Sequence, residues 1–280
     1  MHFLDSVYVF IGNITFAGLI FLIARQFEKR NPIESKQPTV DLAIDWKLAG
    51  LNFVANKLLL PVTSACAMMV VNAAGGGWIT LRSDGWWFLL SFIVLILTID
   101  FWTYIVHRAQ HKFPVLWAMH SLHHSAEAIS MVTGVRHFWL EGPLVSGVFP
   151  LVAIVFKAPL DMVMLVSLFF FLAGDGLAHL NMRLSLGRFV LWVQNPQLHR
   201  IHHSVEPQHQ DKNFCKLLPI FDVIFGTAWK PGKDEFPATG LVSREMATGF
   251  LDGIIWPIRH KLLVQRAVKY KFCSNLARSE

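Results

Sequence analysis

Long apolar runs constrain this chain most, because about 20 apolar residues are enough to cross a lipid bilayer as a helix. The cleanest run covers residues 86–106, and two others cover residues 7–23 and 48–74. Two shorter runs, 144–156 and 160–172, are each short for a full span. We expect those two to form either a hairpin that dips into the bilayer or a pair of tilted helices. The sequence therefore predicts an all-α integral membrane bundle of about four helices.

Basic residues give this bundle an orientation. Four Lys or Arg residues fall between positions 25 and 36, whereas the loop 75–85 has Arg82 as its only basic residue. Because cytoplasmic loops are enriched in Lys and Arg, the end of the apolar run 86–106, next to His107, is expected to face the cytoplasm. We therefore expect a multi-pass protein with its catalytic side cytoplasmic. The membrane would be the inner membrane of a bacterium or the endoplasmic reticulum of a eukaryote.

Composition agrees with a membrane protein and argues against binding of nucleic acid. Hydrophobic residues make up 54% of the chain and charged residues only 16%. The net charge of +6 comes from basic residues scattered beside apolar runs, where they suit acidic lipid headgroups. Nucleic-acid binding is therefore not expected. The three cysteines are far apart, match no metal or redox spacing, and are expected to be packing residues.

The chain divides by character into three regions. Residues 1–85 hold N-terminal spans, residues 86–230 hold the histidine motifs of a catalytic domain, and residues 231–280 form a surface segment. The first apolar run has no basic leader and no clear cleavage site, so a retained anchor is expected. Near the end, residues 253–269 are predicted to form a basic amphipathic helix on the membrane surface.

Histidines are the most specific feature of the sequence. Eight of the 13 fall in three clusters, one H-x-x-x-H and two H-x-x-H-H. On a helix, positions i, i+3 and i+4 share a face, so each cluster is expected to aim its imidazoles at one point. Two chance copies of H-x-x-H-H are expected in roughly one such sequence in a thousand. The eight are His107, His111, His120, His123, His124, His199, His202 and His203.

A shared metal is the simplest partner for so many imidazoles, because burying them unpaired is costly. Imidazole suits zinc, copper, iron and nickel, and the motifs contain no thiolate. A single zinc ion takes three or four protein ligands, so eight or nine histidines suit two ions. The zinc-protease motif H-E-x-x-H is absent. Two metals in an all-nitrogen shell beside membrane helices favour dioxygen chemistry on an apolar substrate.

Four blocks of sequence resemble a known family. They are DFWTYIVHRAQH at 100–111, LWAMHSLHHS at 116–125, NPQLHRIHHS at 195–204, and DKNF with FDVIFGT at 211–227. These blocks are similar to the fatty acid hydroxylase/sterol desaturase superfamily of membrane di-iron enzymes. The last two especially resemble its alkylglycerol monooxygenase branch. The resemblance runs from about Asp100 to Trp229, and the N-terminal spans agree only in character.

The resemblance implies a ligand set, cofactors and partners. It implies metal ligation by the eight clustered histidines and by His179, which matches a lone histidine near the end of an apolar helix. The implied cofactors are two iron ions, which zinc can replace in a crystal, with O2 as co-substrate. Electrons are expected from a separate donor protein, since no haem-binding segment is visible. The oligomeric state stays open.

The implied activity is hydroxylation or desaturation of a membrane lipid. A sterol, a fatty acyl chain, an ether lipid, a carotenoid and an aminolipid all remain possible substrates, because the residues that would select among them lie in unspecific apolar runs. Such a substrate is expected to enter from the bilayer, between helix ends near residues 102–106 and 144–172. Phe169, Phe170 and Phe171 either guide it towards the metals or simply face lipid.

Two acidic residues are candidate catalytic groups. Asp175 stands where some family members carry a second histidine four residues before His179, and it shares a helical face with His179. Asp175 is open to three roles: a metal ligand, an orienting group for His179, or the holder of a water. Asp100 lies seven residues before His107 at the end of an apolar span, where an acid is costly and indicates function. We therefore expect Asp100 to bind a ligand imidazole.

Other residues near the motifs have two interpretations each. Asp211, Asn213 and Asp222 are expected either to accept hydrogen bonds from ligand imidazoles or to serve in turns and caps. His137 is displaced by one position from the family's histidine-proline pair and is interpreted as a neighbour of the ligands or as unrelated. Tyr104 and Trp117 are pocket walls or packing residues.

Two other classes of protein compete with the oxygenase. A membrane metal transporter or sensor without redox catalysis would also use histidine clusters, but transport favours ligands and carboxylates near the bilayer midplane. A membrane zinc hydrolase would need fewer ligands and an evident general base. The position of the clusters at helix ends favours the oxygenase.

Overall fold

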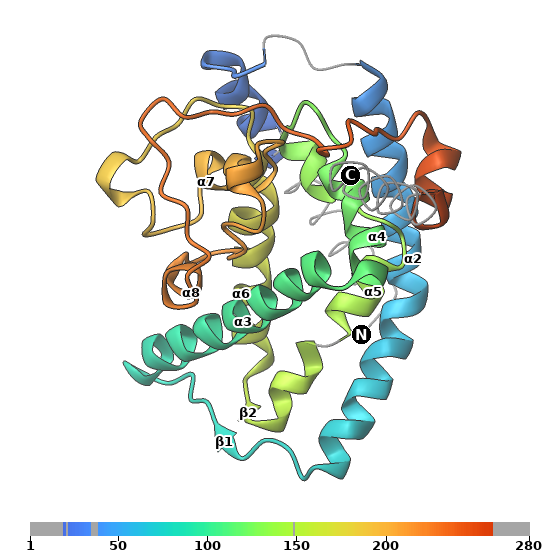
Figure 1. Cartoon of the computed structure of the whole chain (residues 1–280). Coiled ribbons are helices and arrows are strands. Elements are labelled where there is room, and N and C mark those ends of the chain that lie inside the picture. Colours follow the sequence, from blue (N-terminus) through green and yellow to red (C-terminus); the bar gives the residue numbers. More distant parts are fainter. Residues whose placement is uncertain (1–18, 21, 35–38, 148, 260–280) are drawn as a thin grey trace, which may run out of the picture.

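The computed structural model describes residues 19–20, 22–34, 39–147 and 149–259. Most of the predicted first span and residues 260–269 of the predicted amphipathic helix lie outside these residues. The described chain is mostly helical and contains one pair of two-residue strands (Figure 1). The predicted class, a helical membrane bundle with a histidine-rich region, is confirmed.

Three helical segments are long and apolar enough to cross a membrane. They are α2 (Thr39–Ala73), α3 (Trp87–Lys112) and a segment that begins with α6 (Leu160–Phe169). The last continues without a break through the π-helix η3 (Phe170–Gly176) and the short 3-10 helix η4 (Leu177–His179). Most side chains of these segments face outward, as expected for helices surrounded by lipid.

The two short apolar runs therefore take different structures. The second run extends into a full span at residues 160–179. The first becomes two short helices, α5 (Glu141–Ser146) and η2 (Phe149–Ile154), that pack against α2. At the far end, β1 (Ile79–Thr80) pairs in parallel with β2 (Phe156–Lys157), which joins the α2–α3 loop to the start of α6.

The opposite end of the bundle carries the histidine motifs on short helices (Figure 1). Proline begins both motif helices, at a position where its missing N–H costs nothing. The Asn195 side chain accepts a hydrogen bond from the Leu198 amide at 3.1 Å and caps α7. The elements are α4 (Pro114–His124), η1 (Met131–Val135), η5 (Gly187–Phe189), α7 (Pro196–His202), η6 (Pro207–His209) and α8 (Ile220–Ile224).

Two apolar cores join these parts. One lies between the spans and includes Leu95, Met162 and Leu217. The other lies beneath α4 and includes Leu48 and Trp256. Residues 250–259 are helical, and the Trp256 indole donates to Ser121 Oγ at 2.9 Å. The described part of the predicted amphipathic helix is therefore docked on α4 through one face.

Candidate metal centre

Nine histidines from four parts of the chain come together at the histidine-rich end of the bundle. Within each of two groups, one potential ligand atom per residue lies within 4.8 Å of the others. The group of five consists of His107, His111, His120, His124 and His202. The group of four consists of His123, His179, His199 and His203. All nine candidate ligands named from the sequence are thus in one place.

Each H-x-x-H-H motif is shared between the two groups. His120 and His124, at i and i+4, belong to the group of five, while His123 belongs to the group of four. The second motif does the reverse, because His199 and His203 join the group of four and His202 joins the group of five. We expected the three imidazoles of a motif to aim at one point, and they do not. Each motif instead contributes histidines to both groups.

His179 reaches this place through local helix geometry and a glycine. The π-helix η3 and the 3-10 helix η4 end the third span at His179, and π-turns inside helices are frequent at functional sites. Gly134 lies against this turn so closely that a Cβ there would be 2.1 Å from the Asp175 carbonyl oxygen and 3.1 Å from His179 Nδ1. Only glycine at position 134 leaves room for the Asp175 carbonyl, which accepts from His179 Nδ1.

Hydrogen bonds at the outer nitrogens fix which ring nitrogen faces inward. Carbonyl oxygens accept from Nδ1 of His107, His179 and His202 at 2.8 Å and of His123 at 3.2 Å. His120 Nδ1 donates to the Glu141 carboxylate at 2.8 Å. Because a carbonyl oxygen can only accept, the proton sits on Nδ1 and the Nε2 lone pair points into the centre.

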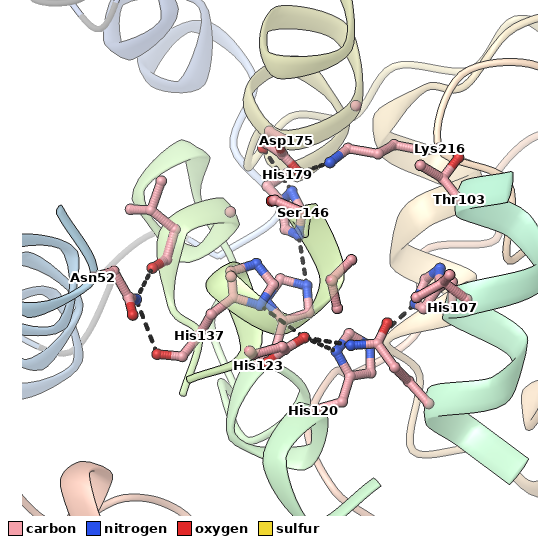
Figure 2. A pocket seen from close by; sticks show the side chains of 18 of the residues that line it. Asn52, Thr103, His107, His120, His123, His137, Ser146, Asp175, His179 and Lys216 are labelled. Carbon is pink, nitrogen blue, oxygen red and sulfur yellow. Dashed lines mark hydrogen bonds and ion pairs between the residues drawn. The ribbon is translucent and has the colours of Figure 1, made fainter. Parts of the chain in front are cut away.

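Those inward nitrogens face one another at short range. Nε2 of His179 lies 2.8 Å from Nε2 of His199. It lies 3.1 Å from Nε2 of His123 (Figure 2). Nε2 of His107 and of His120 are 3.1 Å apart, and the buried Nε2 of His202 has no hydrogen-bond partner among the described residues. Converging lone pairs repel one another unless a cation lies between them, so this donor set fits bound metal.

The environment keeps these imidazoles neutral, which is the form that binds metal. Burial lowers the pKa of His123, His199 and His202 well below the ordinary value, and neighbouring imidazoles lower it further. His124 and His203 show the same shift in pKa from the same causes.

Glu141 is a site residue that the sequence analysis missed. Its buried carboxylate accepts from His120 Nδ1 at 2.8 Å and from Gln110 Nε2 at 2.6 Å, and it lies 3.2 Å from His137 Nδ1. Burial alone would raise the pKa of Glu141, but His137 and His120 hold it well below the ordinary value. An acid at the start of an apolar run, four residues after His137, was the available signal.

Asp100 does not make the expected contact with an imidazole. Its carboxylate accepts from the backbone amides of Leu217 at 3.1 Å and Leu218 at 2.7 Å. Two amide donors compensate for the burial of this acid inside the span. Asp100 therefore anchors the segment after Cys215 to α3 rather than orienting His107.

Asp175 touches His179 through its backbone and not its side chain. The Asp175 carbonyl accepts from His179 Nδ1, while the carboxylate lies 2.8 Å from Lys216 Nζ (Figure 2). The backbone orients the ring, and the carboxylate is held by a cation that the sequence analysis did not consider.

The remaining candidates divide between the centre and the framework. Asp211 Oδ1 lies 3.5 Å from His111 Nδ1, and the Trp117 ring is 4.9 Å from that of His111. Asp222 and Asn213 instead bond backbone groups of the neighbouring loop, and Tyr104 bonds Thr227. The His137 ring stacks on the ring of His123, a member of the group of four, at 4.4 Å.

A cavity of about 270 Å³ adjoins the centre. Histidines from both groups line it, among them His107, His120 and His179, and so does Glu141 (Figure 2). The Asn52 side chain of α2 donates to the carbonyls of Val135 and His137 and holds that wall in place. A small organic group can therefore approach the metal-binding nitrogens.

Replacing Glu141 by glutamine is expected to weaken metal binding about 10- to 100-fold, a range typical of residues that support a ligand histidine. The amide lacks the charge that holds the His120 and His137 rings. Metal affinity measured by chelator competition tests this, with Glu127→Gln as control because Glu127 pairs with the exposed Arg244. Equal affinities in both variants would contradict the role assigned to Glu141.

The metal-free protein is expected to lose stability as the pH falls below about 6.5, the ordinary histidine pKa. Five histidines outside the spans have a lowered pKa when folded, so the unfolded chain takes up more protons in that window and unfolding is favoured. Unfolding midpoints measured in detergent across this range test the expectation. A flat profile from neutral pH to pH 5 would refute it.

Part of the chain matches a known protein family. Residues 92–227 match the family described as fatty acid hydroxylase. Alkylglycerol monooxygenase from Caenorhabditis elegans is 29% identical over 146 residues, which are 52% of this chain and 28% of that protein. Ornithine lipid hydroxylase OlsE from Rhizobium tropici is 27% identical over 180 residues, or 64% and 53%. Alkylglycerol monooxygenase from Danio rerio is 32% identical over 155 residues, or 54% and 31%.

The matched part thus spans between about a quarter and a half of the length of these relatives. No solved structure matches the chain. All nine clustered histidines fall inside the matched residues. The resemblance read from the motifs is therefore confirmed, because residues 92–227 match the fatty acid hydroxylase family.

Proposed function

We propose that this protein is a membrane di-iron monooxygenase that uses O2 to hydroxylate a C–H bond of a lipid. One observation carries the proposal: two interleaved groups of histidines present converging ring nitrogens beside a cavity. Nine nitrogen donors exceed the needs of one ion and suit two. We assign the five-histidine group to one ion and the four-histidine group to the other.

Bound iron would supply the reductive activation of O2 and the removal of hydrogen from an unactivated C–H bond. The chain supplies position and environment. Backbone carbonyls and Glu141 hold five of the imidazoles, those of His107, His120, His123, His179 and His202, in the tautomer whose Nε2 can bind metal. The buried rings exclude bulk water from the centre. Electrons are proposed to come from a separate donor protein.

A lipid substrate is supported by the surroundings of the cavity. Three membrane-length helical segments bear the domain, and a second, apolar chamber adjoins the metal-side cavity. The relatives are named for the oxidation of an alkylglycerol and of ornithine lipid. Hydroxylation, rather than desaturation, agrees with the names of these relatives.

Lipid analysis tests the proposal directly. Cells with the wild-type protein, cells with His199→Ala and cells without the protein would be compared by mass spectrometry. Hydroxylation adds 16 mass units to one lipid class and desaturation removes two, and only the wild type is expected to produce a shift. Purified wild-type protein should also contain about two iron ions per chain. If the wild-type protein causes no change in the lipid profile and shows no metal-dependent O2 uptake, the oxygenase is rejected.

The metal centre is proposed to face the cytoplasm, because the helical segment 22–30, which carries Arg25, Lys29 and Arg30 and is dark blue in Figure 1, lies at the same end of the bundle. Single cysteines at exposed positions 80 and 207, in a cysteine-free background, test this. A membrane-impermeant reagent added outside should label position 80 and spare position 207. The reverse pattern would invert the orientation.

A further inference from the structure

A second cavity of about 590 Å³ lies deeper in the bundle than the metal-side cavity. We call it the apolar chamber. Its walls come from α2, α3, η2, α6 and η3 and include Leu60, Ile99, Val163 and Phe170. All four of these residues belong to membrane-length helical segments. The chamber therefore offers an alkyl chain surroundings as apolar as the bilayer itself.

The two cavities meet at four residues, which we call the throat. Ser146, Phe149, Asp175 and Lys216 line both. Phe149 is apolar, whereas the other three present polar groups. The Lys216 stem crosses the π-helix at Gly174, where a Cβ would be only 2.4 Å from Lys216 Cγ. Glycine at 174 thus allows Lys216 to reach Asp175 across this turn.

The charged pair at the throat is not sealed from its surroundings. Asp175 and Lys216 are 27% and 32% exposed, and both line the cavities on either side. Among the described residues, Asp175 is the only ion-pair partner of Lys216, so donors of the ammonium remain for another acceptor. A charge pair beside apolar walls in a membrane protein is costly and indicates a functional role.

We propose that the Asp175–Lys216 pair binds the uncharged, hydroxyl-bearing polar group of a lipid whose alkyl chain fills the apolar chamber. A hydroxyl group fits both partners, because it donates to the carboxylate and accepts from the ammonium. An anionic group would be repelled by Asp175 and a cationic group by Lys216. This inference deepens the proposed function and rests on it for the reaction.

The position of oxidation follows from this arrangement. The far end of the chain lies in the chamber, away from the histidines, while the throat adjoins His179 through the Asp175 carbonyl. Oxidation is therefore expected within a few carbons of the polar group and not at the far end of the chain.

The test uses the full-length protein in detergent and four probes of equal chain length: an alkane, a primary alcohol, a carboxylate and an amine. Native mass spectrometry measures how much of each probe the protein retains. Product analysis in cells that are fed the same probes, where an electron donor is present, measures turnover. The first variant is Lys216→Met. The second is the double variant Asp175→Asn with Lys216→Met, which removes both charges of the pair. Lys157→Met is the matched control, because Lys157 is exposed next to the chamber and lines neither cavity.

The wild type and the control are expected to retain the alcohol over the alkane by about tenfold or more, since a site built for a hydroxyl rejects an analogue without it. In Lys216→Met and in the double variant the ratio should fall towards one. An unchanged ratio in both variants, or preferred retention of the carboxylate or the amine, would overturn the inference. Selective retention of the alcohol without any product would keep the inference and reject the proposed oxygenase.

Discussion

Replacing His179 by alanine is expected to abolish turnover and to lower bound metal by about one ion per chain. His179 Nε2 lies within 3.1 Å of Nε2 of both His123 and His199, so it occupies the middle of the group of four. Its removal leaves three nitrogens and an opening on the side of the cavity. Metal content by elemental analysis and O2-dependent lipid turnover measure the two effects.

The matched control is His209→Ala. His209 is also fully buried, but it bonds Ser204 Oγ at 2.9 Å and Glu235 at 3.0 Å and belongs to neither group. Its loss is expected to lower stability while the ratio of metal to folded protein stays at the wild-type value. If His179→Ala keeps full metal content and activity, His179 is not a ligand.

Replacing Asp45 by alanine is expected to destabilise the protein by about 3–5 kcal/mol, the usual effect of breaking a buried ion pair by removing one partner. Asp45 on α2 lies 3.0 Å from Arg136 Nε, and both side chains are almost completely buried. The Arg136 carbonyl in turn accepts from His123 Nδ1. Unfolding of the purified protein in detergent measures the loss, and lower metal affinity should accompany it.

An exposed ion pair provides the comparison for Asp45. Arg82 and Asp84 lie 2.6 Å apart, but their side chains are 56% and 64% exposed. Solvent screens such a pair, so Asp84→Ala is expected to leave the free energy of unfolding nearly unchanged. A similar loss of unfolding free energy in Asp45→Ala and Asp84→Ala would show that burial of the Asp45–Arg136 pair does not determine its contribution to stability.

The sequence predicted that the clustered histidines would lie together because their spacing follows short-range rules. H-x-x-H-H on a helix brings three imidazoles to one side, and apolar length locates the spans. The same rules could not divide the ligands, because i+3 and i+4 differ by a fraction of a turn. Only the packing of α4 against its neighbours sends His123 and His124 to different groups.

Residues that act across long distances in sequence were harder to predict. Glu141 supports His120 from 21 positions away, and Lys216 meets Asp175 from 41 positions away. No periodicity connects such residues. Asp100 shows the converse: a buried acid correctly indicates a special role, but its partners are backbone amides, which no side-chain pattern reveals.

The division of each motif between the two groups also determines when, during synthesis of the chain, each group of histidines becomes complete. A nascent chain that has emerged only as far as Asn195 lacks His202 of one group and both His199 and His203 of the other. All three candidate membrane-length helical segments have by then been synthesised. Neither group of histidines is therefore complete until α7 has also been made, after all three of these segments.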